Sequence, residues 1–199
     1  MTIVAFIRHG ATQWNEDGRM QGRADLPLSD TGRAALQALR APAMLLGHRW
    51  HASPLGRTLE SARILGPGAF AIEPRLIEMH WGVWQGETLA GLRGRLGAAM
   101  QENEDRGLHF RPEGGESPAE VQARLKSWFR DIAHPGRPVT AVTHKGVIRA
   151  ALALAYDWDM MGKPPAKLDW DAVHLFDASP TGVVVPVALN IAFDARNGG

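Results

Sequence analysis

The sequence has no cysteine among its 199 residues. This absence excludes disulfide bonds, thiolate metal sites and phosphatases that attack their substrate with a cysteine. An excess of either charge is missing too, since 22 Lys and Arg residues face 21 Asp and Glu residues and leave a net charge of +1. Nucleic acid and anionic membranes are therefore not expected as partners. Any anion-binding site must be built locally.

The chain also lacks a long apolar run. The run before Arg8 is five residues long, too short for a secretory signal, and the longest later run, residues 150–156, cannot cross a bilayer. We therefore expect a cytoplasmic protein without a membrane partner. The length suits a single domain over residues 1–199, as a monomer or homodimer, that buries about 70% of the surface its unfolded chain exposes.

Predicted strands and helices alternate along the chain. Apolar patterns predict strands over residues 3–7, 48–53 and 138–143, each with a helix after it. Residues 172–189 have the pattern of two more strands, with Pro186 suited to a sheet edge because proline cannot donate a backbone hydrogen bond. A turn is expected at residues 134–136 and a loose end at 197–199. The alternation predicts a three-layer α/β/α sandwich around a mostly parallel sheet.

The clearest helix signal begins at Ser117. Pro118 suits the first helical position, and Glu120 completes a capping box with the Ser117 hydroxyl. Apolar residues then recur at helical spacing, and Trp128 lies on that apolar stripe. The seven Trp residues are therefore better explained by core packing than by stacking on nucleic acid, because no basic run accompanies them.

Arg8-His9-Gly10 stands where the first predicted strand ends. Ligands usually bind at that edge of an α/β sheet. A guanidinium matches two oxygens of a phosphoryl group at once, and a neutral imidazole can attack phosphorus. The tripeptide alone is a weak signal, since three residues recur by chance.

Three further segments place charged or titratable residues at strand ends or tight loops. They are Ser53-Pro54-Leu55-Gly56-Arg57, Leu76-Ile77-Glu78 followed by Gly82, Trp84 and Gly86, and Thr143-His144. Taken singly, Arg57 could form a structural salt bridge, Glu78 could be a solvated surface acid, and His144 could be a core histidine. Together, the four segments point to one phosphate site.

With these motifs the sequence resembles the histidine phosphatase superfamily, also called the phosphoglycerate mutase-like family, from Ile3 to about Tyr156. Thr12, Trp14 and Asn15 continue the family's first motif. Two positions depart from the pattern. Ala11 replaces an acid outside the phosphate-contacting set, and Ser61 stands where threonine is commoner, which keeps the hydroxyl.

The resemblance implies a role for each motif residue. His9 is expected to be the nucleophile that becomes phosphohistidine, and Glu78 the group that protonates the leaving alkoxide and later activates water. Arg8, Arg57 and His144 are expected around the phosphate, with Asn15 as an additional donor. Two arginines beside the phosphate can take the place of a metal ion, so neither a metal nor another cofactor is expected. His48 and His51 do not suggest a metal pair, because their odd spacing on a strand separates their side chains.

The substrate is expected to be a small phosphorylated metabolite, and the reaction its hydrolysis. A phosphoglycerate mutase would use the same residues, but mutases of this family carry a longer insertion than residues 87–113. Arginines in that stretch could still meet an acidic substrate or simply be solvated. They are Arg93, Arg95, Arg106 and Arg111. A binding module that only senses phosphate is a further alternative, although it would need neither His9 nor Glu78.

Three features stay open at this point. Asp157-Trp158-Asp159 superficially resembles the motif of magnesium-dependent phosphatases that use an aspartate nucleophile. That motif opens a domain after a strand, whereas Asp157-Trp158-Asp159 follows a predicted helix. Lys145, next to His144, is predicted to be solvated or to face the substrate. Residues 158–170 either border the mouth of the site or cover a sheet edge.

Overall fold

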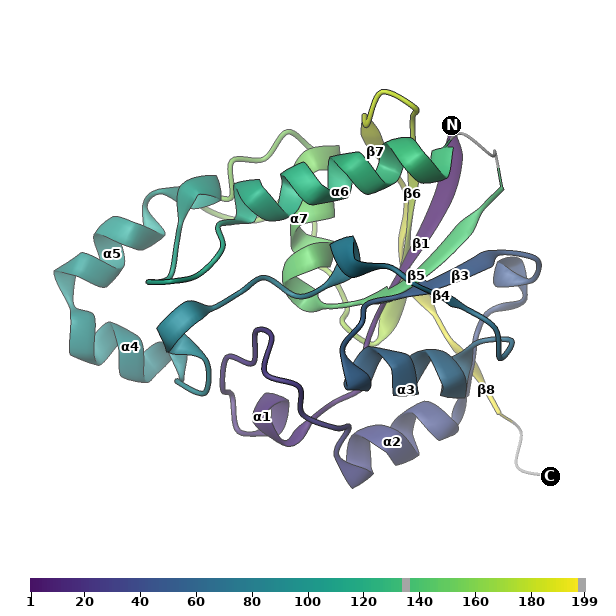
Figure 1. Ribbon diagram of the computed structural model, residues 1–199, viewed down its shortest axis with the longest axis horizontal. Coiled ribbons are helices and arrows are strands. Elements are labelled where there is room, and N and C mark those ends of the chain that lie inside the picture. The colour runs from purple at the N-terminus through teal and green to yellow at the C-terminus, as the bar shows by residue number, and fades with distance from the viewer. Residues whose placement is uncertain (134–136, 197–199) are drawn as a thin grey trace.

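The computed structural model describes residues 1–133 and 137–196 of the chain (Figure 1). The predicted turn at residues 134–136 and the end at 197–199 lie outside the described residues. In chain order the strands and α-helices are β1 (Thr2–Arg8), α1 (Gln13–Glu16), α2 (Asp30–Gln37), β2 (Leu39–Arg40), β3 (Arg49–Ala52), α3 (Gly56–Leu65), β4 (Ala71–Ile72), α4 (Leu89–Leu96), α5 (Ala98–Glu104), α6 (Pro118–Ala133), β5 (Val139–Thr143), α7 (Lys145–Ala155), β6 (Ala172–Ala178), β7 (Val184–Ala192) and β8 (Asp194–Ala195). None of the helices so described is both long and apolar enough to cross a bilayer.

The main sheet has the strand order β4-β3-β5-β1-β6-β7. Strands β4, β3, β5 and β1 are parallel neighbours, β6 is antiparallel to β1, and β7 is antiparallel to β6. Hence β6 alone runs against the others of this sheet. Pro186 lies on the edge strand β7, as predicted, where its missing N–H costs no ladder bond. The predicted mostly parallel α/β sheet is confirmed.

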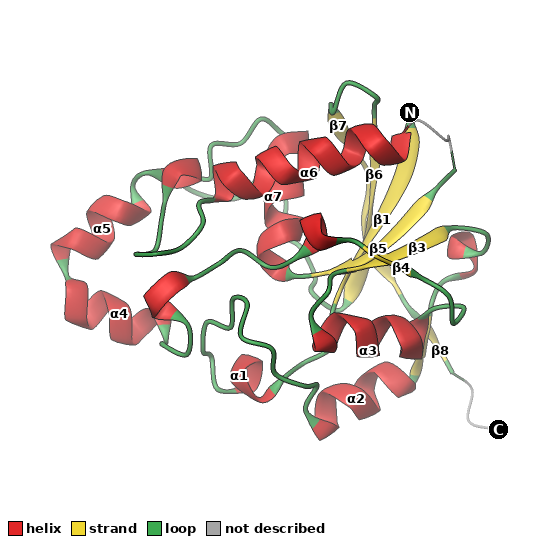
Figure 2. Ribbon diagram, viewed as in Figure 1, coloured by secondary structure: helices red, strands yellow, loops and turns green. Residues whose placement is uncertain are grey.

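Helices cover both faces of the sheet, with α6 and α7 on one side and α2 and α3 on the other (Figure 2). The alternation of side chains along β1 explains both layers. Phe6 packs in the cluster that holds Trp128 of α6, whereas Ile7 packs in the cluster that holds Leu36 of α2. Trp128 is fully buried, as its place on the apolar stripe predicts. Helices α4 and α5 lie on the left of the view, away from the sheet (Figure 1).

Side-chain caps begin α2 and α6, and the cap at Ser117 is the one that the sequence predicts. The Ser29 hydroxyl accepts the Gly32 N–H at 3.0 Å and begins α2. At α6 the Ser117 backbone N–H donates to the Glu120 carboxylate at 2.8 Å, and the Glu120 N–H donates back to the Ser117 hydroxyl. Such a capping box satisfies two backbone donors that the helix leaves unpaired.

Candidate active site

The register of the sheet brings the two strand-end histidines together. Arg8 of β1 pairs with Thr143 of β5 in a parallel ladder, and the His9 N–H extends it by donating to the Thr143 carbonyl at 3.0 Å. His9 and His144 therefore leave adjacent strands at the same edge. Their ring centroids lie 5.0 Å apart, and both side chains are buried.

The hydrogen bonding of His9 determines which nitrogen is available for chemistry. Nδ1 lies 2.7 Å from the carbonyl oxygen of Gly10, which can only accept, so Nδ1 carries the proton. Burial, followed by the positive charges of Arg57 and Arg8, holds the pKa of His9 well below its ordinary value. The ring is therefore neutral at physiological pH and has an unprotonated Nε2, as a nucleophile requires.

His144 is fixed in the complementary way. Its Nε2 lies 2.7 Å from the Ser53 hydroxyl, which also accepts the Leu55 N–H at 3.4 Å. The tautomer in which the Ser53 hydroxyl donates to Nε2 places the His144 proton on Nδ1. Burial and the positive charge of its neighbours lower the pKa of His144 well below the usual value. Nδ1 has no hydrogen-bond partner among the described residues and is buried, so a ligand oxygen would complete it.

Arg57 is fully buried in the first turn of α3. Its Nη1 donates to the carbonyl of Ala24 and its Nη2 to the carbonyl of Gly22, both at 2.7 Å. Among the described residues, Arg57 is therefore held by backbone carbonyls and not by the structural salt bridge considered above. Burial lowers the pKa of Arg57 to about 10, so the group is still charged at neutral pH. The buried Nε has no partner among these residues.

Arg8 supplies the second guanidinium. Its Nε is buried and, within residues 1–133 and 137–196, without a hydrogen-bond partner. Burial lowers its pKa, and the negative charges of Asp171 and Glu78 oppose that shift. Asp171 is a neighbour that sequence reasoning did not identify, because it lies far along the chain beyond the last recognised motif.

Glu78 is buried, with 8% of its surface exposed, which rules out the solvated acid. Its Oε1 accepts the Met79 N–H at 2.7 Å, and its Oε2 accepts the Gly146 N–H of α7 at 3.3 Å. Burial raises the pKa of Glu78 in spite of those two hydrogen bonds and the positive charges of Arg57 and Arg124. The carboxyl thus keeps its proton to higher pH than an ordinary glutamate.

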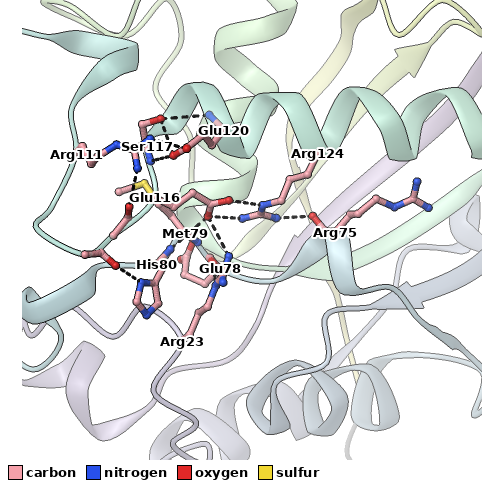
Figure 3. A network of polar contacts seen from close by, with 12 residues as sticks. Arg23, Arg75, Glu78, Met79, His80, Arg111, Glu116, Ser117, Glu120 and Arg124 are labelled. Carbon is pink, nitrogen blue, oxygen red and sulfur yellow. Dashed lines mark hydrogen bonds and ion pairs between the residues drawn. The ribbon is translucent and has the colours of Figure 1, made fainter.

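A network of ion pairs holds the backbone that carries Glu78 (Figure 3). Arg23 donates to the Glu78 carbonyl at 3.2 Å and pairs with Glu116 at 3.3 Å. Glu116 in turn pairs with Arg124 of α6 at 2.9 Å and accepts the His80 N–H at 3.3 Å. This network connects the loop around Arg23, the Glu78 segment and α6. Its members are scattered along the sequence, so no local motif reveals them.

Asn15 occupies a more constrained place than the sequence suggests. It is the third residue of α1, where its Oδ1 accepts the N–H and the hydroxyl of Thr12 in a capping box. The amide Nδ2 is the part of this side chain that can still donate to a ligand. Nearby, the Ser61 hydroxyl accepts the Gly10 N–H at 3.0 Å, so serine supplies the hydroxyl at this position.

The described surface includes two grooves that bear on the site. The larger, of about 530 Å³, lies between α6, α7 and the β6–β7 turn and contains none of the predicted site residues. The smaller, of about 250 Å³, begins at Lys145, directly after His144. Its lining includes Trp158 and Trp170, so both ends of the 158–170 segment lie beside α7. The described residues hold no group of three or more metal-ligating side chains.

Comparisons with known proteins agree with this geometry. A family model described as the histidine phosphatase superfamily, branch 1, matches residues 4–186. A glucosyl-3-phosphoglycerate phosphatase of Mycolicibacterium vanbaalenii is 33% identical over 183 residues, with 80% of this chain and 78% of that protein covered. A probable phosphoglycerate mutase of Cronobacter sakazakii is 36% identical over 137 residues, with 63% and 60% covered. The structure of a mycobacterial glucosyl-3-phosphoglycerate phosphatase complexed with VO3 matches with a TM-score of 0.78 at 26% identity, over 96% of this chain and 100% of that one.

Proposed function

The chain belongs to the histidine phosphatase superfamily, and from this membership we propose that it hydrolyses a small phosphate monoester through a phosphohistidine at His9, without a metal. The predicted enzyme class, a phosphatase, is confirmed by the family and by the names of its relatives. The observation that carries the mechanism is the pairing of His9 with His144 at 5.0 Å, with Nδ1 of His9 held by the Gly10 carbonyl. A binding module would not need a free Nε2 there.

In the first step the Nε2 lone pair of His9 attacks phosphorus, and the bond between phosphorus and the ester oxygen breaks. The electron pair of that bond goes to the departing oxygen, which takes the proton of the Glu78 carboxyl and leaves as an alcohol. Burial supports this role, because it raises the pKa of Glu78 and keeps the acid form available. The products of the step are phospho-His9 and ionised Glu78.

In the second step the Glu78 carboxylate accepts a proton from water as the water oxygen attacks phosphorus. The bond between phosphorus and Nε2 breaks, and its electron pair returns to His9. Inorganic phosphate leaves, and both residues regain their starting protonation states. One carboxyl thus serves as acid and then as base, as microscopic reversibility of the two steps requires.

Arg8, Arg57 and His144 stabilise the charge on the phosphoryl oxygens, with Asn15 as a further donor. A guanidinium about 4 Å from a phosphate charge contributes roughly 4 kcal/mol at an effective dielectric constant near 20, before desolvation is subtracted. The buried, unpartnered Nε atoms of Arg8 and Arg57 and Nδ1 of His144 support this assignment. The structural neighbour solved with VO3, an oxyanion, is consistent with it.

The ion pairs of residues 87–113 favour hydrolysis over mutase activity. Three of the four arginines that could meet an acidic substrate there are paired with carboxylates. The pairs are Arg93 with Glu104 at 2.8 Å, Arg95 with Glu87 at 3.2 Å and Arg111 with Glu120 at 2.5 Å. We further propose that residues 1–199 form one catalytic domain, which the family match over residues 4–186 supports, and that this domain works in the cytoplasm.

With 3-phosphoglycerate as substrate, we expect release of inorganic phosphate and no net formation of 2-phosphoglycerate. The physical reason is that a mutase must hold its acidic substrate while the phosphoryl group moves to a second hydroxyl, whereas three of the four arginines that could do so in residues 87–113 are paired with carboxylates. Phosphate release and isomerisation should be measured in the same reaction, with a chelator present. Isomerisation faster than phosphate release would contradict the assignment.

Gly146→Ala is expected to lower phosphate release about 10- to 100-fold, in the range that overpacking of a tight site costs. A Cβ added at Gly146 would lie 2.5 Å from Oε1 of Glu78, so the carboxyl must move away from the leaving oxygen. Gly146 is thus a positioning residue, and esters with poor leaving groups should lose most. Gly94→Ala is the matched control, because a Cβ on that helical glycine of α4 meets nothing within 4 Å. Equal rates in the two variants would contradict this role.

A further inference from the structure

The 250 Å³ groove beside His144, here called the Lys145 groove, carries three cations. Lys145 and Arg149 lie one turn apart on α7, and Lys167 joins them from the following segment. No acidic side chain lines the groove, and none of the three cations forms an ion pair with another described residue. Most arginines of residues 87–113 are neutralised, so these cations stand out as charge left available to a ligand.

Two of these cations, Lys145 and Arg149, contact tryptophan rings instead of carboxylates. The Lys145 ammonium lies 5.0 Å from the ring centroid of Trp170, and the Arg149 guanidinium lies 5.7 Å from that of Trp158. A cation over an aromatic face is held in position but keeps its full charge. The two tryptophans therefore orient the cations without neutralising them, which is the arrangement an incoming anion needs.

The Lys145 groove adjoins the proposed phosphate site at the start of α7. Lys145 is the residue after His144 and begins α7. The next residue, Gly146, donates its N–H to Oε2 of Glu78 at 3.3 Å, so the start of α7 lies against the carboxyl of the proposed site. The pKa of Lys145 is lowered by burial and then by the positive charges of Arg8 and Arg149. The negative charge of Asp171, the residue after Trp170, opposes the lowering of the Arg8 pKa by burial. A substrate whose phosphate lies on Arg8 can thus extend its other end along this groove.

We propose that the Lys145 groove binds a second acidic group, a carboxylate or a phosphate, on the leaving-group part of the substrate. This inference rests on the proposed phosphatase function and names the substrate class of that site. Lys145 and Arg149 would pair with the second acid, and Lys167 would add to the positive field. Substrates with a neutral leaving group lose these contacts and should be processed less well.

The test compares substrates that differ in one acidic group. The carboxylate arm uses 3-phosphoglycerate against glycerol 3-phosphate, and the phosphate arm uses fructose 1,6-bisphosphate against fructose 6-phosphate. For each pair the ratio of kcat/KM values, acidic over neutral, is measured in the wild type and in the Lys145→Gln, Arg149→Gln double variant. Lys126→Gln is the matched control, because Lys126 lines the larger groove.

We expect the wild type to prefer the acidic member in at least one arm, and the double variant to lower that ratio about 5- to 30-fold, mainly through KM. The arm that responds identifies the second acid. A ratio near one in the wild type, or a ratio that the double variant leaves unchanged in both arms, overturns the inference. Release of phosphate that depends on His9 would then still support the proposed function.

A binding measurement keeps the two proposals separate. The same four compounds are titrated by calorimetry into His9→Ala with and without the Lys145 and Arg149 changes, which requires no turnover. Tighter binding of the acidic member that is lost with the two cations supports the groove even where hydrolysis is not detected. Equal binding of both members overturns it.

Discussion

His9→Ala is expected to lower phosphate release at least about 10⁴-fold, the scale on which loss of a covalent nucleophile acts. His9 is the group whose Nε2 is kept free of a proton and directed into the site by the Nδ1 bond to Gly10 at 2.7 Å. His144 cannot replace it, because its Nε2 is engaged by Ser53 at 2.7 Å. Phosphate release under single-turnover conditions measures the effect on chemistry without interference from product release.

The intermediate gives a second readout for the same prediction. Wild-type enzyme quenched in alkali during turnover should carry a phosphoryl group that is labile to acid, and His9→Ala should carry none. His109→Ala is the matched control, since His109 is exposed and lies outside the proposed site. An acid-labile adduct that persists in His9→Ala would place the nucleophile elsewhere. Full activity of His9→Ala would refute the phosphohistidine mechanism.

The fold was largely predictable because local patterns in the sequence indicate its strands and helices. The five-residue apolar run before Arg8 suits a strand buried on both faces, and it is the strand next to the centre of the sheet. The capping box at Ser117 and the edge position of Pro186 are equally local. Short pairings such as β2 with β8 were not predicted, since each has two residues and depends on tertiary contact.

The candidate site was predictable only in its motif residues. The strand-end positions of His9 and His144 follow from parallel pairing of their strands, which sequence alternation implies. The hydroxyl of Ser53 on His144, the Gly146 N–H on Glu78 and the charge of Asp171 near Arg8 join residues far apart in the chain. No spacing in the sequence predicts contacts between residues so far apart, so only the structure reveals them.

The partners of the charged side chains could also be identified only from the structure. Arg57 lies in the first turn of α3, where the helix dipole repels a cation. Two backbone carbonyls at 2.7 Å compensate it, and burial still leaves it charged at neutral pH. Likewise, sequence alone could not separate paired from unpaired cations, and that distinction is what sets Lys145 and Arg149 apart from Arg93, Arg95 and Arg111.

Glu78→Gln is expected to lower kcat/KM for an alkyl phosphate about 10²- to 10⁴-fold, the usual contribution of a general acid. An alkoxide is a poor leaving group and needs the proton that Glu78 carries, whereas a nitrophenolate leaves without one. The first step for 4-nitrophenyl phosphate should therefore be far less sensitive to the substitution. Gln keeps the shape and an acceptor oxygen for the Met79 N–H, so phosphate binding should change little.

The pH dependence of the same variant tests whether Glu78 acts as an acid. Because burial raises the pKa of Glu78, its protonated form is present below that raised value and is lost as the pH rises through it. Wild-type kcat/KM for the alkyl ester should thus fall on the alkaline side, and Glu78→Gln should lack that limb. His9 has its pKa shifted in the opposite direction, so the nucleophile stays neutral well below the ordinary histidine range and the two groups overlap in their active forms. Glu102→Gln, an exposed carboxyl on α5, is the control. If Glu78→Gln kept the native alkaline limb, or slowed both esters equally, the acid would have to be another group.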